Sequence, residues 1–126
     1  MYLSACIEWL FREEYPDFSD RVRAAKAQGF SHVEFHLWRD KPLAALAQAL
    51  EETGVTLSSF VVEPRRSLVD PAEHEQFLAA VSDSLAVSRQ LGSPPLVVAS
   101  GFSREGVAIA EQQAQAIDIQ IGRAHV

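Results

Sequence analysis

Three glutamates each fall near the end of a short apolar stretch of the sequence. Glu8 lies in LSACIEWLF, Glu34 in HVEFHLW, and Glu63 near the end of TLSSFVVEP. A partly buried carboxylate can exchange a proton near neutral pH, and it can accept hydrogen bonds from the hydroxyl groups of a small ligand. Structural interpretations stay open beside this one, because Glu34 can be hydrogen-bonded within the protein and Glu63 can pair with Arg65 or Arg66. We therefore expect all three to line a substrate site, and we assign none of them a catalytic role.

Two further residues extend this candidate site. Trp38 lies four residues beyond Glu34, on the same face if the stretch is a strand, where it can stack on a small substrate or simply pack as an aromatic. Ser100 closes a fourth apolar stretch together with Gly101, and the pair can line the site or simply make the turn. The predicted substrate-binding set is therefore Glu8, Glu34, Trp38, Glu63 and Ser100.

The histidines and the single cysteine give a weaker case for chemistry. His32 and His36 share a face with Glu34, but metal-binding histidines on a barrel strand are normally separated by one residue, and these are separated by three. We expect both to be core or surface histidines. Cys6 has no base beside it in the sequence, so we expect it to act as a small buried hydrophobe. No glycine-rich phosphate-binding motif is present.

The elements that must position these residues alternate regularly along the chain. The expected strands are residues 3–11, 32–38, 56–64 and 94–101, and the expected helices are residues 17–29, 40–54, 70–92 and 107–120. Asp17 and Asp70 are expected helix caps, and Gly54 is an expected helix end. Four strand–helix units in series predict a parallel sheet, because each crossover returns the chain in the same direction.

The polarity of the strands distinguishes an open sheet from a barrel. In HVEFHLW the residues at 33, 35 and 37 are apolar, and those at 32, 34, 36 and 38 are His, Glu, His and Trp. LSACIEWLF divides in the same way, with Trp9 on the apolar face and Glu8 on the polar one. A central strand of an open sheet is apolar on both faces, whereas a barrel strand has helices on one face only. Since a (β/α)8 barrel needs about 250 residues, we predict an α/β fold that is the first four units of a TIM barrel.

Composition excludes several classes of partner. The formal net charge is -6, which argues against a nucleic-acid partner because phosphate binding needs a surplus of Lys and Arg. The sequence has one cysteine, and its N-terminus lacks the pattern of a signal peptide or a membrane span. We therefore expect a cytoplasmic protein that does not bind membranes.

Three passages resemble a known group of enzymes. SACIEWLF, AAKAQGFSHVEFHLWRDK and FVVEPRRSLVDPAEHEQF are similar to the N-terminal half of the xylose-isomerase-like barrels, within which the hydroxypyruvate isomerase family is the most similar. The likeness covers about residues 4–106, and its most specific parts are the GFxxVEF and EPxxSLVDP motifs.

The resemblance implies an activity and a cofactor. These enzymes interconvert an α-hydroxy aldehyde and an α-hydroxy ketone by proton transfer between two glutamates, usually around a divalent metal such as Mg²⁺ or Mn²⁺. Their metal ligands and bases lie on later strands, so none is assigned to this sequence. A dehydratase or epimerase on the same barrel, similar to inosose dehydratase, remains an alternative, as does a non-catalytic fragment. The expected partner is a small carbonyl compound.

The C-terminal residues raise a separate expectation. Residues 121–126 read IGRAHV, which is the in-frame translation of a widely used sequencing-library adapter that continues into a stop codon. We therefore expect residues 1–120 to be the N-terminal half of a barrel and residues 121–126 not to be native. Such a half-barrel would lack isomerase activity, and it would expose the edge of its fourth strand at Leu96 to Ala99. We expect it to self-associate through that edge.

Overall fold

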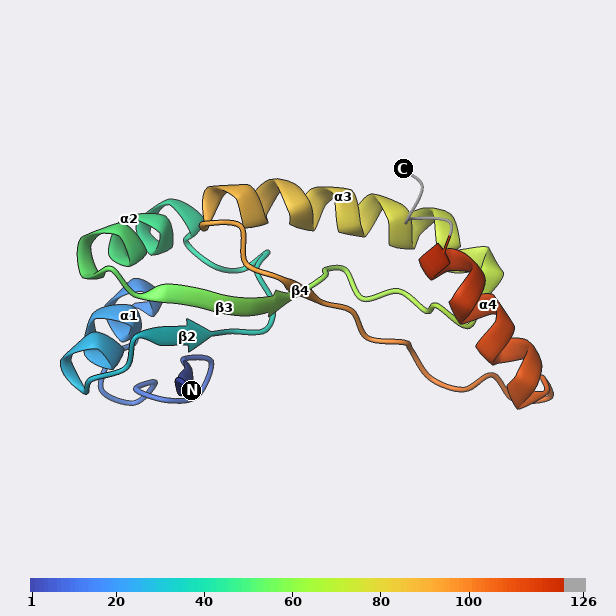
Figure 1. Ribbon diagram of the computed structural model, residues 1–126, viewed down its shortest axis with the longest axis horizontal. Coiled ribbons are helices and arrows are strands. Elements are labelled where there is room, and N and C mark those ends of the chain that lie inside the picture. The colour runs from blue at the N-terminus through green and yellow to red at the C-terminus, as the bar shows by residue number, and fades with distance from the viewer. Residues whose placement is uncertain (122–126) are drawn as a thin grey trace.

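Strands and helices alternate along the chain in the computed structural model, which describes residues 1–121 (Figure 1). The elements are β1 (Ser4–Cys6), α1 (Phe18–Ala27), β2 (His32–Glu34), α2 (Leu43–Thr53), β3 (Thr56–Val61), the 3-10 helix η1 (Pro71–Glu73), α3 (His74–Gln90), β4 (Leu96–Val97) and α4 (Ile109–Ile121). The strands are parallel and form one sheet in the order β1-β2-β3-β4. This confirms the predicted fold class, four successive βα units of a TIM barrel. The interpretation of residues 121–126 as non-native lies outside the described residues, apart from the helical backbone of Ile121.

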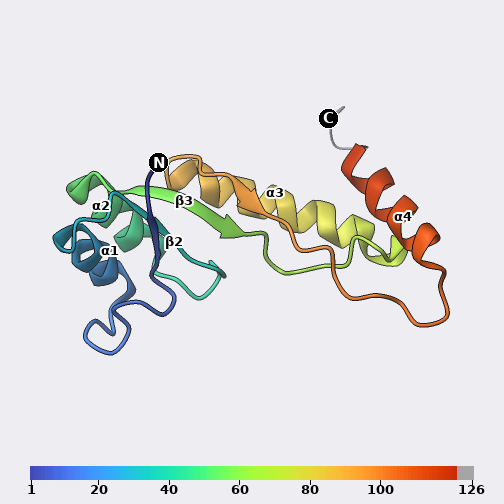
Figure 2. The same cartoon turned by 60° about the horizontal axis from the view of Figure 1, so that its bottom comes forward.

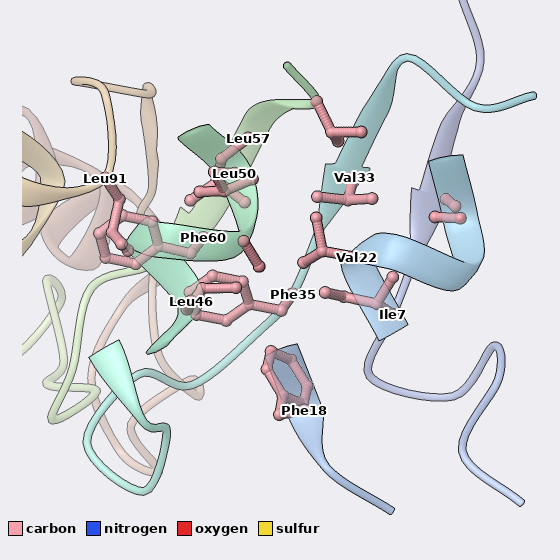
Figure 3. Close-up of a cluster of buried hydrophobic side chains, with 14 of the residues drawn as sticks. Ile7, Phe18, Val22, Val33, Phe35, Leu46, Leu50, Leu57, Phe60 and Leu91 are labelled. Atoms are coloured by element: carbon pink, nitrogen blue, oxygen red, sulfur yellow. The ribbon is translucent and has the colours of Figure 1, made fainter. Parts of the chain in front are cut away.

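The helices cover one face of the sheet. Residues of β1, β2 and β3 that point to this face, Ala5, Val33, Leu57 and Phe60, are buried in one cluster with side chains of α1, α2 and α3 (Figure 3). The flanking strand residues Ser4, Cys6, His32 and Glu34 are only half-buried. This one-sided burial is what the strand polarity predicted. We call the face of the sheet that points away from the helices the open face.

The far end of the molecule is formed by α3 and α4. In both views α3 runs beside β3 and β4, and α4 lies at the end opposite to α1 and α2 (Figures 1 and 2). A second apolar cluster joins these parts, since Ile119 of α4 packs with Phe77 and Val81 of α3 and with Leu68 before them. No helix within residues 1–121 is long and apolar enough to span a membrane.

Helix ends follow the expected local chemistry in part, and α2 begins at Leu43 after Pro42 rather than at the predicted residue 40. The Asp17 carboxylate accepts a hydrogen bond from the backbone N–H of Ser19 at 2.9 Å, and Gly54 ends α2 with a left-handed φ of 66° that suits a residue without Cβ. Asp70 accepts from the N–H of Ala72 at 3.1 Å, but the turn that it caps is the 3-10 helix η1. The regular helix α3 therefore begins at His74 rather than at the predicted residue 70.

All four strands are shorter than predicted. The β1 ladder ends at Cys6, because the chain turns there and the N–H of Leu10 donates to the Cys6 carbonyl at 3.0 Å. The β2 ladder ends at Glu34, and β3 contains an irregularity in which Val33 pairs with Leu57 but Glu34 pairs with Ser59. Side chains keep alternating directly beyond these ladders, since Ile7 and Phe35 are buried, but the alternation is lost at Trp9 and Trp38.

Candidate functional site

Three polar side chains lie together on the open face. Cys6 of β1 is paired in register with Glu34 of β2, and its Sγ lies 3.8 Å from Nε2 of His36. The ring of Trp9 meets the His36 ring edge-on, with centroids 4.7 Å apart. Within residues 1–121 the Glu34 carboxylate has no hydrogen-bond or ion-pair partner. Glu34 thus lies on the face where the sequence placed it, and its contact with substrate stays a prediction.

His36 and Cys6 form part of this cluster, which the sequence did not predict. Cys6 was expected to be a buried hydrophobe, but it is half-buried and its thiol faces an imidazole. His36 was expected to be an ordinary core or surface residue. The sequence could have indicated this pair, because Cys6 and His36 occupy the same alternating positions as Glu34 on two adjacent strands. These positions place all three side chains on one face of a parallel sheet.

Burial raises the pKa of the Cys6 thiol, and the negative charges of Glu34 and Glu8 add to this effect. We therefore expect Cys6 to react with iodoacetamide more slowly than free cysteine at pH 8, because the thiolate is the reactive species. Replacing Glu34 with Gln removes one of the negative charges that raise the pKa of Cys6, so the alkylation rate at this pH should rise. Mass spectrometry of timed reactions between pH 7 and 10 measures both effects, with Glu51→Gln on the outer helix α2 as the control. Equal rates for Glu34→Gln and the parent chain would contradict the placement of Glu34 beside Cys6.

Glu8 holds the loop that follows β2. Its Oε2 accepts a hydrogen bond from the backbone N–H of His36 at 2.9 Å, and its Oε1 accepts from Nζ of Lys41 at 2.7 Å. Burial opposes the charge on Lys41, but hydrogen bonds to Glu8 and Asp40 outweigh it and raise the pKa of the ammonium. Both carboxylate oxygens of Glu8 are therefore engaged within the protein, although the residue lies at the predicted end of β1.

Glu63 holds the same loop from the other side. Its Oε2 accepts hydrogen bonds from the backbone N–H groups of Trp38 at 2.9 Å and Arg39 at 2.8 Å. No ion pair joins Glu63 to Arg65 or Arg66 within the described residues, so the alternative partner that the sequence suggested is wrong. Glu8 and Glu63 together fix residues 36–41, because their carboxylates accept hydrogen bonds from this loop.

The expected position of Trp38 on the open face is wrong. Its side chain is buried in the main core, and its indole N–H donates to Oγ of Ser84 in α3 at 3.0 Å. Trp9, which was expected to face the helices, is instead 61% exposed beside His36. Both errors have one cause, since each tryptophan lies beyond the end of its ladder, where the two-residue alternation no longer holds. Trp9 is thus the tryptophan that contacts His36.

Two clefts lie at the ends of the strands, and the first of them borders this loop. The first, of about 470 Å³, is lined by His36, Lys41, Val61, Arg65 and Val97 among others. The second, of about 740 Å³, is lined by Arg65 and Arg66 from the segment after β3 and by Ser100 and Phe102 from the segment after β4. Ser100 is exposed here, and its contact with substrate stays a prediction. Arg65 borders both clefts and connects them.

The divalent metal implied by the sequence resemblance does not fit the side chains seen here. Among the residues that the structure describes, no group of three or more His, Cys, Asp or Glu side chains is placed to hold a metal ion. We therefore derive no chemical step through a metal for this part of the chain.

Comparisons with known proteins identify the fold. Among the solved structures similar to this chain is one described as an AP endonuclease, family 2, from Brucella melitensis, with a TM-score of 0.81 and 24% identity over 94% of this chain and 48% of that one. Another is a D-allulose 3-epimerase from Methylomonas sp. in complex with D-allulose, with a TM-score of 0.58 and 17% identity over 81% of this chain and 38% of that one. No family profile and no curated protein matches the sequence. The chain therefore has the fold of half a TIM barrel and spans about half the length of the first structure.

Proposed function

We propose that this chain forms the first half of a xylose-isomerase-like barrel enzyme that isomerises a small α-hydroxy carbonyl compound, with hydroxypyruvate as its substrate. The observation that carries the proposal is the unpaired carboxylate of Glu34 beside His36 and Cys6 on the open face. In a TIM barrel this face lines the interior, and active sites lie at the carboxyl ends of the strands.

The chemistry assigned to these residues is substrate binding and proton transfer. Isomerisation moves a proton between two adjacent carbons, and the charge that develops on the substrate oxygens must be stabilised. Glu34 can accept a hydrogen bond from a substrate hydroxyl or hold a proton, because nothing else within residues 1–121 occupies its carboxylate. Glu8 and Glu63 are committed to the loop at residues 36–41, so a second free carboxylate is not supplied here. We therefore expect residues 1–126 alone to be inactive.

An epimerase or a dehydratase on the same barrel is the second candidate. The similarity to a D-allulose 3-epimerase favours this alternative, because epimerisation also moves a proton at a carbon next to a carbonyl. Endonuclease activity, which is named for the other similar structure, is disfavoured by the net charge of -6.

The decisive experiment uses the longer protein that this proposal requires. The gene is read beyond codon 120, the complete product is purified, and hydroxypyruvate isomerisation, D-allulose epimerisation and inosose dehydration are assayed in parallel with Mg²⁺ or Mn²⁺. We expect hydroxypyruvate to be the preferred substrate, and Glu34→Gln to lower kcat by roughly 10²–10⁴-fold if the carboxylate transfers a proton. Glu51→Gln on the outer helix α2 should leave kcat unchanged. A product without isomerase activity, or an unaffected Glu34→Gln variant, would reject the corresponding part of the proposal.

A further inference from the structure

The cleft between the segments that follow β3 and β4 is lined by two consecutive arginines. Arg65 and Arg66 are both exposed. Neither has a carboxylate or hydrogen-bond partner within residues 1–121, whereas Arg23, Arg39 and Arg104 are each paired with an acidic side chain. Acidic residues outnumber basic ones in this chain by 17 to 11, so the lack of a partner here does not reflect a shortage of carboxylates.

The acidic residue that borders the cleft is already engaged. Glu73 lies at its wall, and its Oε2 accepts a hydrogen bond from the backbone N–H of Ser67 at 2.8 Å. This contact fixes the segment that carries the two arginines. The carboxylate thus shapes the cleft and leaves both guanidinium groups free for an anion.

The two segments are held together closely. The backbone N–H of Leu68 donates to the carbonyl of Ser100 at 3.0 Å. Gly101 has a φ of +90°, and a Cβ at this position would lie 2.8 Å from Oγ of Ser67, so only glycine allows this approach. The floor of the cleft is therefore formed before a ligand arrives, which lowers the cost of binding.

One hydroxyl at this floor has no partner. Oγ of Ser67 is buried and makes no hydrogen bond within the described residues. Buried polar atoms in proteins nearly always have a partner, and an exception needs an explanation such as a missing ligand or water. Ser67 lines the cleft beside Arg66. Ser100 lies on the opposite segment, and its exposed hydroxyl donates to the Gly101 carbonyl at 3.5 Å. Hydroxyl donors and guanidinium groups together are the groups that bind a small oxyanion.

We propose that this cleft binds the oxyanion group of the substrate, with Arg65 and Arg66 as its charged ligands and the hydroxyls of Ser67 and Ser100 as further donors. The inference rests on the proposed function and assigns the residues that hold the carboxylate of its substrate. Hydroxypyruvate carries a carboxylate, whereas a neutral sugar offers nothing for two guanidinium groups. Arg65 also borders the cleft that His36 lines, so the proposed oxyanion site adjoins the loop that follows β2.

Calorimetric titration of the full chain, residues 1–126, tests this assignment. Hydroxypyruvate is the carboxylate probe, inorganic phosphate is the alternative oxyanion, and dihydroxyacetone is the neutral control of similar size. We expect hydroxypyruvate to bind, dihydroxyacetone not to bind, and the double variant Arg65→Gln, Arg66→Gln to weaken hydroxypyruvate binding by about tenfold or more. Phosphate binding that is tighter than hydroxypyruvate binding and lost in the same variant would assign the oxyanion to a phosphate ester and overturn the carboxylate assignment.

The matched control is Arg89→Gln, which removes an exposed arginine of α3 that lines neither cleft. This variant should bind as the parent chain does. Both cleft arginines are exposed and unpaired, so the double variant should keep the far-ultraviolet circular dichroism of the parent. Unchanged binding in the double variant, or equal binding of dihydroxyacetone, would overturn the inference.

The oxyanion cleft and the proposed isomerase activity can be accepted or rejected independently of each other. Arginine-dependent binding together with a longer protein that does not isomerise hydroxypyruvate would keep the oxyanion cleft and reject the isomerase. Isomerisation with an unchanged KM in the double variant would keep the isomerase and reject the cleft.

Discussion

Replacing Phe35 with alanine should lower the free energy of unfolding by about 3–5 kcal/mol, because a buried phenyl ring is lost and a cavity remains. Phe35 is 1% exposed and directly follows β2. Its ring stacks on Phe60 of β3 at 5.4 Å and meets Phe18 of α1 edge-on at 5.6 Å (Figure 3). The residue therefore joins two strands to a helix. Since natural domains unfold at a cost of about 5–15 kcal/mol, this change removes a large part of the stability.

Urea denaturation followed by circular dichroism measures this effect. Phe102→Ala is the matched control, because it deletes the same ring from a side chain that is 94% exposed. Its free energy of unfolding should stay within about 0.5 kcal/mol of the parent value. Similar losses in the two variants would contradict the position of Phe35 at the centre of the core.

The fold could be predicted because its signals are local. Asp17 and Gly54 mark helix ends through contacts within a few residues, and the alternation around Val33 separates the two faces of β2. Repetition of this pattern four times leaves a parallel sheet as the simplest arrangement. Strand ends could not be predicted in the same way, because the apolar residues after Cys6 and Glu34 continue without a break in composition.

The site was less predictable because its contacts join distant segments. Glu8 binds the N–H of His36 across 28 residues, and Glu63 binds the N–H of Trp38 across 25. A carboxylate at the end of a strand looks the same in the sequence whether it meets a ligand or a neighbouring loop. The sequence could therefore identify acidic residues near the mouth of the barrel. It could not show that Glu8 and Glu63 hold the loop at residues 36–41 whereas Glu34 does not.

The two outer edges of the sheet lead to the second large effect. In the order β1-β2-β3-β4, the first and last strands each lack one neighbour within the described residues. Apolar side chains lie beside both edges: Leu3 is 72% exposed next to β1, and Val97 and Val98 are 48% and 40% exposed at β4. Unpaired backbone groups next to apolar side chains favour pairing with another chain.

We expect the chain to associate with a second copy through these edges. A twofold axis along the barrel would place β4 of each copy beside β1 of the other, and the new pairs would be parallel, as within the sheet. Eight strands would then close, which removes both free edges. Light scattering after gel filtration should therefore give twice the chain mass of 13.9 kDa, without isomerase activity. If a longer chain supplies further strands that pair with these same edges, that longer chain should instead be a monomer.

Val98→Pro should weaken this association by about tenfold or more, because proline has no N–H to donate to a neighbouring strand. The carbonyl of Val97 accepts a hydrogen bond from the N–H of Val62, so Val97 directs its backbone groups toward β3. The N–H of Val98, one residue further, then points to the outer edge. Val98→Ala is the control, since it shortens the side chain but keeps this donor. A monomeric parent chain, or equal dissociation constants for the two variants in analytical ultracentrifugation, would rule out pairing through β4.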